Sequence, residues 1–509
     1  MIDDGDQGMN LHRISGMILL LLVPTAAVAD EPLPAGAKMK FLVPGAAPGN
    51  RPWCVAFSPD GKTLAVGASD KQIHLFDVET GRHLRCFGSH LDYVWTIAFS
   101  PDGKWIASGG RADFPVRIWS LDGVEQKPCE GEHQGGITKI KFFKDGKRLI
   151  MSGGSWDPTL RVWDFPNRKQ LVDMKGHTDY IDAMDLASNE RIAVTASRDG
   201  TWRLWDVRNG RQVGQGPIQG EWVKDLALAK DSRSFVMCAD SRFVIYEIAS
   251  RDIRMEFAED FGAVAYSQDG VLMAAGGAAL SLRESATGAE LWRVENLGSV
   301  GAGNCALAFS PDGNMVAVSG ASGLVYIWQR PRLWQMDTYT IKLSAVERLE
   351  AWEELAWSRA KESFRAMQRL RRDSAAVEEF LAARLKPAAE PDRKQIARWI
   401  DDLGSQKYAE REEASRHLAD VGEAAGDALS LAWYGNLSLE ARNRVRRLLE
   451  RLDAGPSPET LQTLRAIEVL ERRGKPEAIP ILKRLAAGAP GFAATIDAQE
   501  TLERMQKRK

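Results

Sequence analysis

The chain has 509 residues, of which 44% are hydrophobic and 27% are charged, and its formal net charge at pH 7 is −2. This length exceeds the roughly 100–200 residues of a typical domain, and the hydrophobic content is too high for a disordered chain. A net charge so close to zero provides no basic field for DNA or RNA. The composition therefore indicates a folded, multidomain protein that binds no nucleic acid.

Residues 1–29 have the pattern of a secretory signal peptide. A basic pair, His12-Arg13, precedes an apolar run at residues 17–23, and small residues follow at 27–29. This order is typical of signal peptides, and the run is shorter than the roughly 20 residues that span a bilayer. An uncleaved anchor and a chance apolar N-terminus are the alternatives. We expect an exported bacterial protein, periplasmic or extracellular, with no stable membrane span after cleavage.

One short phrase recurs through residues 50–332. It is AFSPDGK at 56–62 and at 98–104, KFFKDGK at 141–147 and AFSPDGN at 308–314, with weaker copies between them. Its Asp-Gly pair is typical of a tight hairpin, because glycine tolerates positive φ. An apolar marker before the turn recurs every 38 to 44 residues, at Phe57, Phe99, Phe142, Leu186, Leu228, Tyr266 and Phe309. A period of about 40–45 residues with short strands predicts seven blades of a β-propeller.

Most units end their third predicted strand in a Trp-Asp-like pair, as in LFDV at 75–78 and LWDV at 204–207. With this pair and the repeated turn, residues 50–332 resemble a WD-repeat (G-β-like) propeller. The resemblance implies a buried set in each blade, made of a His, a Ser or Thr, an Asp and the Trp. The residues that match are His90, Trp119, His133, Trp163, His177, Ser197, Asp199 and Trp205. Because these histidines recur at one fixed offset, we expect them to satisfy buried polar groups rather than to act as bases or metal ligands.

The seventh unit stops after its third strand, at Trp328. Its outer strand is expected to come from the N-terminus, at residues 38–43, which have no other partner. Such closure removes the exposed sheet edges that promote aggregation. The propeller is therefore expected at residues 30–332, followed by a linker at 333–342.

From residue 343 to 509 the pattern changes to that of helices. Apolar residues recur at intervals of three and four, and prolines interrupt the run. The basic stretch RNRVRR at 442–447 is expected to be a solvated helix face and not a nucleic-acid site, because glutamates are interleaved with it. A second repeat, offset by 52 residues, relates two helix–glycine–helix units through Ala414, Leu418 and Gly422 and then Ala466, Leu470 and Gly474.

This second repeat resembles HEAT-like repeats, although its period exceeds their usual 40–47 residues or so. Helix pairs that bury their faces only against neighbours form an α-solenoid. The predicted fold class is therefore multidomain, with an all-β seven-bladed propeller followed by an all-α helical-repeat, α-solenoid-like domain. The order of signal peptide, propeller and helical domain resembles a group of exported planctomycete WD-repeat proteins, which implies no particular activity.

The sequence contains no motif for catalysis or cofactor binding such as GxSxG, GxxxxGK[ST] or HExxH. Its five cysteines form no CxxC, no CxxCH and no Cys/His cluster, so we expect neither a metal site nor a cofactor. Outside the repeat positions, the signal segment and the helical domain, only His74 and His83 remain, and no acid, base and stabiliser converge. We therefore expect a non-catalytic scaffold for a protein or peptide partner. A propeller enzyme, or a small-ligand or glycan binder at the central channel, is the alternative.

The resemblance also implies where a partner binds. In WD-repeat propellers the residue four before the marker opens the innermost strand and faces the channel mouth on the top face. This position and the loop before it supply the predicted partner-binding residues, Trp53, Tyr93, Trp95, Tyr180, Asp182, Trp222 and Lys224. Tryptophan and tyrosine are enriched among interface hot spots. The alternative is that the rings only seal a packed core; the helical domain is a second candidate surface.

Overall fold

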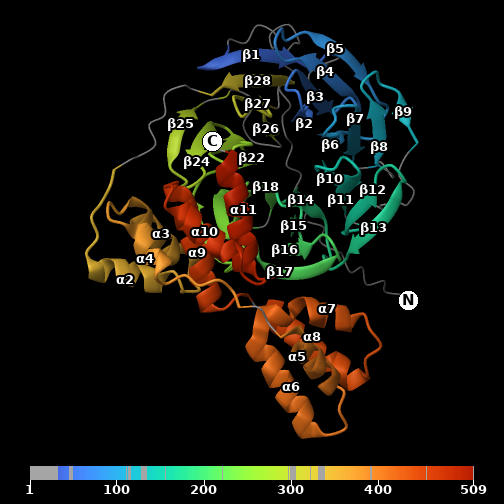
Figure 1. Ribbon diagram of the computed structural model, residues 1–509. Helices are drawn as coiled ribbons and strands as arrows, with labels where there is room; N and C mark the ends of the chain where they lie inside the picture. Colours follow the sequence, from blue (N-terminus) through green and yellow to red (C-terminus); the bar gives the residue numbers. More distant parts are fainter. Residues whose placement is uncertain are drawn as a thin grey trace, which may run out of the picture.

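The computed structural model describes residues 33–44, 50–110, 112, 116–127, 135–154, 156–220, 222–295, 297, 305–320, 323–330, 339–389, 392–453 and 455–507. The predicted signal peptide lies outside the described residues. Strands occupy the first part of the chain and helices the second (Figure 1). This order confirms the predicted combination of an all-β part and an all-α part.

Seven four-stranded antiparallel sheets form a ring, with the first strand of each blade innermost (Figure 1). Blades one to four consist of β2 (Pro52–Phe57), β3 (Thr63–Ala68), β4 (Ile73–Asp77), β5 (His83–Phe87), β6 (Val94–Phe99), β7 (Trp105–Gly110), β8 (Arg117–Ser120), β9 (Glu125–Gln126), β10 (Ile137–Phe142), β11 (Arg148–Gly153), β12 (Leu160–Asp164), β13 (Lys169–Met174), β14 (Ile181–Leu186), β15 (Ile192–Ser197), β16 (Thr201–Asp206) and β17 (Arg211–Pro217). Blades five to seven consist of β18 (Val223–Leu228), β19 (Ser234–Ala239), β20 (Arg242–Glu247), β21 (Ile253–Phe257), β22 (Phe261–Tyr266), β23 (Leu272–Gly277), β24 (Leu280–Glu284), β25 (Glu290–Val294), β26 (Leu307–Phe309), β27 (Met315–Ser319), β28 (Leu324–Gln329) and β1 (Ala37–Leu42). The prediction of seven blades is confirmed.

The N-terminal strand completes the last blade. β1 pairs antiparallel with β28, so that Phe41 lies opposite Val325. The indole Nε1 of Trp328 donates to the carbonyl oxygen of Ala35 at 3.3 Å. The two ends of the propeller therefore hold each other.

The recurring phrase forms the hairpin between the first two strands of a blade. In blade one, Ser58 Oγ donates to Asp60 Oδ1 at 2.6 Å, and the Thr63 amide donates to Ser58 Oγ at 2.9 Å. Gly61 has a φ of 72°, a conformation that glycine adopts without the steric cost of a Cβ. The hairpin thus depends on the Ser, Asp and Gly of the phrase together.

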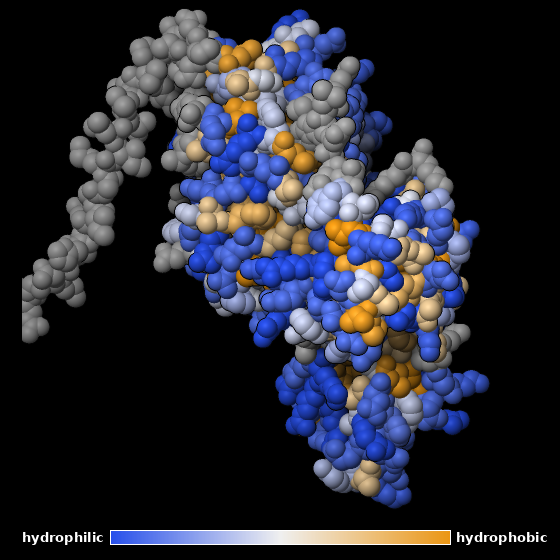
Figure 2. Space-filling model, turned by 90° about the vertical axis from the view of Figure 1, so that its left-hand side faces the viewer, coloured by the Kyte–Doolittle hydropathy of each residue, from blue (hydrophilic) through white to orange (hydrophobic). Residues whose placement is uncertain are grey.

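The helices of the C-terminal part form two lobes. They are α2 (Ala345–Glu354), α3 (Ala360–Arg372), α4 (Val377–Ala382), α5 (Arg393–Asp402), α6 (Tyr408–Val421), the 3-10 helix η2 (Gly422–Ala425), α7 (Gly426–Trp433), α8 (Leu439–Asp453), α9 (Pro458–Arg473), α10 (Ala478–Ala486) and α11 (Ala493–Lys507). Helices α5 to α8 share one apolar core, whereas α2 to α4 pack with α9 to α11 around another. The α5–α8 lobe projects from the rest of the protein (Figures 1 and 2). Among the helices described, none has both the length and the apolar composition needed to cross a bilayer.

The two copies of the predicted helical repeat lie in different lobes. Leu418 is buried in α6, which ends at Gly422, and Leu470 is buried in α9, which ends at Gly474 with a φ of 63°. Each copy has the expected helix–glycine–helix form. However, α9 packs on α3, which precedes the α5–α8 lobe in the chain. The helices therefore do not form one continuous array of sequential pairs.

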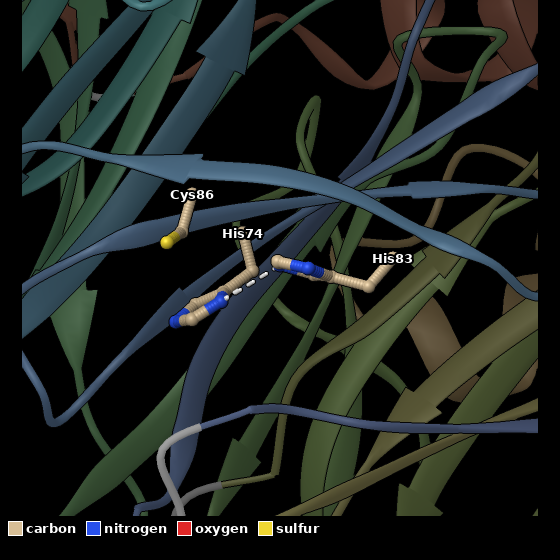
Figure 3. Close-up of side chains that lie close together, drawn as sticks. All are labelled: His74, His83 and Cys86. Carbon is tan, nitrogen blue, oxygen red and sulfur yellow. Dashed lines mark hydrogen bonds between the residues drawn. The ribbon is translucent and has the colours of Figure 1, made fainter.

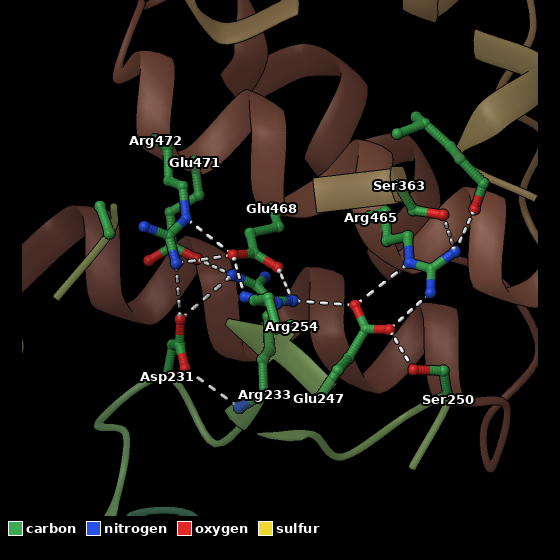
Figure 4. Close-up of polar contacts among 12 residues, drawn as sticks. Asp231, Arg233, Glu247, Ser250, Arg254, Ser363, Arg465, Glu468, Glu471 and Arg472 are labelled. Carbon is green, nitrogen blue, oxygen red and sulfur yellow. Dashed lines mark hydrogen bonds and ion pairs between the residues drawn. The ribbon is translucent and has the colours of Figure 1, made fainter. Parts of the chain in front are cut away.

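The lobe of α2–α4 and α9–α11 is fixed to blade five by buried ion pairs (Figure 4). Glu247, at the end of β20, accepts hydrogen bonds from Arg465 of α9 at 3.1 and 2.5 Å and from Arg254 of β21 at 2.8 Å. Arg254 also donates to both oxygens of Glu468 of α9 at 2.9 Å. All four side chains are at most 3% exposed. Propeller and lobe thus share an interface in which these charges are withdrawn from water.

Candidate functional site

The repeat histidine of blade two belongs to a buried hydrogen-bond network. Ser108 Oγ lies 2.9 Å from His90 Nε2 and accepts from Trp119 Nε1 at 2.7 Å. All three side chains are buried. A buried network of this kind holds strands together, and its histidine is inaccessible to a substrate.

Blade four has the same network, but with a different hydroxyl from the one predicted. Thr195 Oγ1 lies 2.7 Å from His177 Nε2 and accepts from Trp205 Nε1 at 2.8 Å, while Asp199 holds the other nitrogen of His177 at 2.7 Å. Ser197 instead donates to a backbone carbonyl oxygen at 2.7 Å. The assignment of Ser197 as the hydroxyl of this network is wrong, because Thr195, two positions earlier in β15, contacts both His177 and Trp205. Burial lowers the pKa of His177 in spite of Asp199, which suits a structural role.

Blade three departs from this pattern. Trp163 is buried, but the strand register places Met151 where blade two has Ser108. The Nε1 atom of Trp163 consequently has no hydrogen-bond partner among the residues that the structure describes. His133, its predicted companion, lies outside those residues, so a network in blade three stays a prediction.

The predicted partner-binding aromatics form one continuous row. Trp53 stacks on Tyr93 with ring centroids 5.4 Å apart, and it lies 6.4 Å from Trp95. Trp95 in turn lies 6.1 Å from Tyr180. Since Trp95 belongs to blade two and Tyr180 leads into blade four, the row passes blade three and spans the channel mouth. Trp53 and Trp95 are half-buried, whereas Tyr93 is 40% exposed.

Arg198, which the sequence analysis did not single out, extends this row. Its guanidinium carbon lies 4.6 Å from the ring centroids of both Tyr180 and Trp222, and its Nη2 lies 3.0 Å from Asp182. Burial raises the pKa of Asp182, although Arg198 opposes the shift. The available signal was the place of Arg198 in the turn after β15, at the same end of the blade. We call the following six residues the mouth row: Tyr93, Trp53, Trp95, Tyr180, Arg198 and Trp222.

The charged groups next to the mouth row are paired with one another. Lys224 does not join the row but forms an ion pair with Asp260 at the start of blade six. Deeper in the ring, Lys139 of blade three bonds Asp225 of blade five at 2.9 Å. Because blade four lies between them, this bond crosses the channel.

The mouth row and the helices lie on opposite faces of the propeller. Trp222 comes just before β18, and the turn with Arg233 follows the far end of that strand. Arg233 donates to Glu471 of α9 at 2.7 Å and to Asp497 of α11 at 3.1 Å. A six-residue strand is about 20 Å long, so the mouth row faces away from the docked lobe.

The structure also brings together three residues that no sequence motif connects. His74 Nδ1 lies 3.2 Å from His83 Nε2, and one ring nitrogen of each histidine and Cys86 Sγ all lie within 4.8 Å of one another. The expectation that the sequence holds no Cys/His cluster is therefore wrong for blade one. A sequence motif is defined by the spacing of residues along the chain, whereas these three residues come together because their two strands pair.

Comparison with known families identifies the repeats. The family model described as "WD domain, G-beta repeat" matches residues 46–77, 81–120, 127–164, 168–206 and 300–329. The propeller contains WD40 repeats. The matched segments fall on blades one to four and seven, and the reported matches do not extend over blades five and six.

Several curated proteins are similar to the propeller. The nuclear distribution protein nudF of Aspergillus niger is 30% identical over 168 residues, which are 32% of this chain and 38% of that protein. The small ribosomal subunit protein RACK1y of Oryza sativa subsp. japonica is 30% identical over 165 residues, which are 31% of this chain and 49% of that protein. The serine-threonine kinase receptor-associated protein of Dictyostelium discoideum is 27% identical over 280 residues, which are 53% of this chain and 91% of that protein. The chain thus spans less than half of the first two relatives.

Proposed function

We propose that the protein is a non-catalytic scaffold that binds a protein or peptide partner through the mouth row of its WD40 propeller. The observation that carries this proposal is the unbroken contact from Tyr93 through Trp95 to Trp222 across the channel mouth. Large aromatic rings lose little side-chain entropy on binding and dominate interface energies. A row built from residues of blades one, two, four and five offers an extended peptide several such rings at once.

The electrostatics of the face support a peptide better than a small ligand in the channel. Arg198 is held between two rings and Asp182, so that its donors are oriented before a partner arrives. A ligand deeper in the channel has to compete with the ion pair of Lys139 and Asp225. We therefore assign binding to the mouth rather than to the channel interior.

Two further observations support a scaffold. The Dictyostelium relative is named for its association with a serine-threonine kinase receptor, which is a protein. In this chain, the projecting α5–α8 lobe exposes large side chains near one another in sequence, Leu431, Tyr434 and Leu439. We propose this lobe as a second contact surface of the same scaffold.

Affinity capture from the native envelope fraction tests the proposal. The bait is the full chain, compared with Trp95→Ala and with Trp357→Ala as a control, because Trp357 is also a half-exposed tryptophan but lies in the helical part. We expect one protein to be recovered by the wild type and the control and lost with Trp95→Ala. Equal recovery by all three baits contradicts binding at the mouth row, and loss with Trp357→Ala alone moves the site to the helices.

We also propose that the chain is exported, on the basis of the signal-peptide pattern at residues 1–29. N-terminal sequencing of the native protein tests this. A mature chain that begins near Asp30 supports export, and a chain that retains the apolar run overturns it.

A further inference from the structure

Blade one carries a cluster of two histidines and a cysteine on its two outer strands (Figure 3). His74 lies on β4, and His83 and Cys86 lie on β5. His74 is buried, His83 is half-buried and Cys86 is exposed. The cluster therefore opens to solvent on the side of the thiol.

An irregularity in the strand pairing puts the three side chains on one face. In a regular strand, residues three apart such as His83 and Cys86 point to opposite faces. Here His74 lies opposite Cys86 and Phe76 lies opposite His83, with one extra residue, Leu84, in β5. A bulge of this kind places His83 and Cys86 on the same face of the sheet. The backbone thus assembles the cluster by itself.

In blade three, the positions equivalent to His74 and Cys86 hold an oppositely charged pair. Arg161 and Asp173 lie opposite each other as His74 and Cys86 do. The Nε atom of Arg161 lies 3.4 Å from Asp173 Oδ1, as an ion pair. Blade one therefore has an imidazole and a thiol where blade three has a guanidinium and a carboxylate.

In blades two and four, the position equivalent to His83 holds a polar residue that is paired with an arginine. Glu125 and Gln212 each lie opposite the Trp of their blade, as His83 lies opposite the residue at the Trp position. Arg117 bonds Glu125 at 2.7 Å, and Arg203 bonds Gln212 at 2.9 Å. In blade one all three positions that form these polar pairs hold groups that ligate transition metals.

Asp70 orients His74 from the side opposite the cluster. Its Oδ2 accepts from His74 Nε2 at 2.9 Å, which leaves the lone pair of Nδ1 directed toward His83. Its Oδ1 accepts from the Gln72 amide at 3.1 Å, so the carboxylate is itself held. Histidines that bind metals usually donate their other ring N–H to a carboxylate, which fixes the tautomer and the ring. Asp157 of blade three holds Arg161 in the same way, and in blade one the contact orients His74 as metal-bound histidines are oriented.

We propose that His74 Nδ1, His83 Nε2 and Cys86 Sγ bind a Zn²⁺ ion, with a fourth position open to water or to a ligand from another molecule. Imidazole nitrogen and thiolate sulfur are donors that Zn²⁺ takes in tetrahedral sites. With Zn–N bonds of about 2.0–2.1 Å, two tetrahedral nitrogens lie about 3.3 Å apart. The two nitrogens are 3.2 Å apart in the structure.

Little has to change when the ion enters. Cys86 Sγ has to reach the distance of a Zn–S bond, about 2.3 Å, and its side chain is exposed, so that it can rotate toward the two nitrogens. The thiol proton is released to solvent, and the proton of His83 moves from Nε2 to Nδ1, so that the ligands are one thiolate and two neutral imidazoles. The bound ion ties β5, the outer edge of blade one, to β4.

The test uses the full chain after removal of metal with a chelator. Zn²⁺ is titrated in competition with a chromophoric chelator, and Co²⁺ serves as a spectroscopic probe. We expect one ion per chain and a thiolate-to-Co²⁺ charge-transfer band. Cys86→Ser and His83→Gln should each weaken Zn²⁺ binding by at least about tenfold, whereas His417→Gln, a histidine of the helical part, should leave it unchanged.

A variant that keeps the fold separates metal binding from misfolding. His74→Arg combined with Cys86→Asp recreates the ion pair of Arg161 and Asp173 in blade one. We expect this double variant to keep the melting temperature of the metal-free wild type and to bind no Zn²⁺ at the site. Zn²⁺ binding equal to that of the wild type, no binding by the wild type, or a Co²⁺ complex without the thiolate band overturns the proposal.

Discussion

Arg465 of α9 and Glu247 of β20 form a two-pronged ion pair, at 3.1 and 2.5 Å, in which each side chain is at most 3% exposed. Glu247 occupies the position that the WD pair gives to Asp in blades one and four. There the shorter side chain bonds within its own turn, as Asp77 does with the Thr80 amide at 2.8 Å. Glu247 also bonds its own turn, and its extra methylene group extends the carboxylate to the helix. A glutamate at this repeat position thus adds a contact to α9 to those made by Arg254 and Arg233.

Removing the charge of Arg465 should destabilise the protein strongly. Arg465→Met leaves Glu247 buried with one partner fewer, and breaking a buried pair costs about 3–5 kcal/mol. Urea unfolding followed by tryptophan fluorescence measures the free energy of unfolding. Arg446→Met is the matched control, because its contact with Glu450 is exposed and such pairs contribute about 0–1 kcal/mol. Equal losses in both variants contradict the role of the buried pair.

The stability that Glu247 provides should disappear in acid. Burial would raise the pKa of Glu247, but Arg254 and Arg465 outweigh it and hold the pKa below its ordinary value. A carboxylate with a lowered pKa in the folded state stabilises the protein above its unfolded pKa of about 4.3 and loses this effect as the pH falls below that value. The difference in unfolding free energy between the wild type and Glu247→Gln should therefore be largest near pH 7 and shrink below about pH 4. A difference that stays constant from pH 7 to pH 3 refutes this.

Thr195, rather than Ser197, should couple to the tryptophan of blade four. Thr195→Val leaves the buried N–H of Trp205 without its acceptor and His177 Nε2 without the Thr195 hydroxyl, which costs about 1–3 kcal/mol. Trp205→Phe removes the indole donor in advance. The unfolding free energies of both single variants and the double variant form a cycle, and we expect a smaller loss for the double variant than for the sum of the single ones. Strict additivity would show that the hydrogen bond is unimportant.

Trp95 should be a hot spot of partner binding. It contacts Trp53 on one side and Tyr180 on the other, so its removal interrupts the mouth row at its centre. We expect Trp95→Ala to weaken partner binding by about 2 kcal/mol or more, about 30-fold in Kd, without unfolding the propeller. Calorimetric titration measures the affinity and circular dichroism checks the fold. An unchanged Kd in a folded variant argues that the rings only seal the core.

The number of blades could be predicted because each repeat carries its own turn and its own marker. An apolar marker such as Phe57 recurs at residue 99 even where other positions of the repeat vary. The predicted number of blades therefore does not depend on any single residue. The same regularity led to Tyr93 and Trp95, which lie at fixed offsets from the marker. Arg198 was missed since its contacts to Tyr180 and Trp222 join side chains from different blades.

Features that depend on the register between paired strands could not be predicted from the spacing of residues in the sequence. The assignment of Ser197 was such a case, although His90 and Ser108 have the same spacing of 18 residues as His177 and Thr195. The docking of α9 was missed because an arginine in an amphipathic helix predicts an exposed face unless its partner is known. Here that partner, for Arg465, lies 218 residues away.

The pairing of β1 with β28 imposes an order on folding during synthesis. Ala35 and Trp328, which are hydrogen-bonded in the finished ring, are 293 residues apart in the chain. At about 5–20 residues per second, the ribosome needs roughly 15–60 s to make that stretch. Throughout this time the first strand of the propeller is an unpaired edge without its partner. The last blade therefore closes only after β28 has been made, and a chain released before residue 329 leaves its N-terminal strand available to neighbouring molecules.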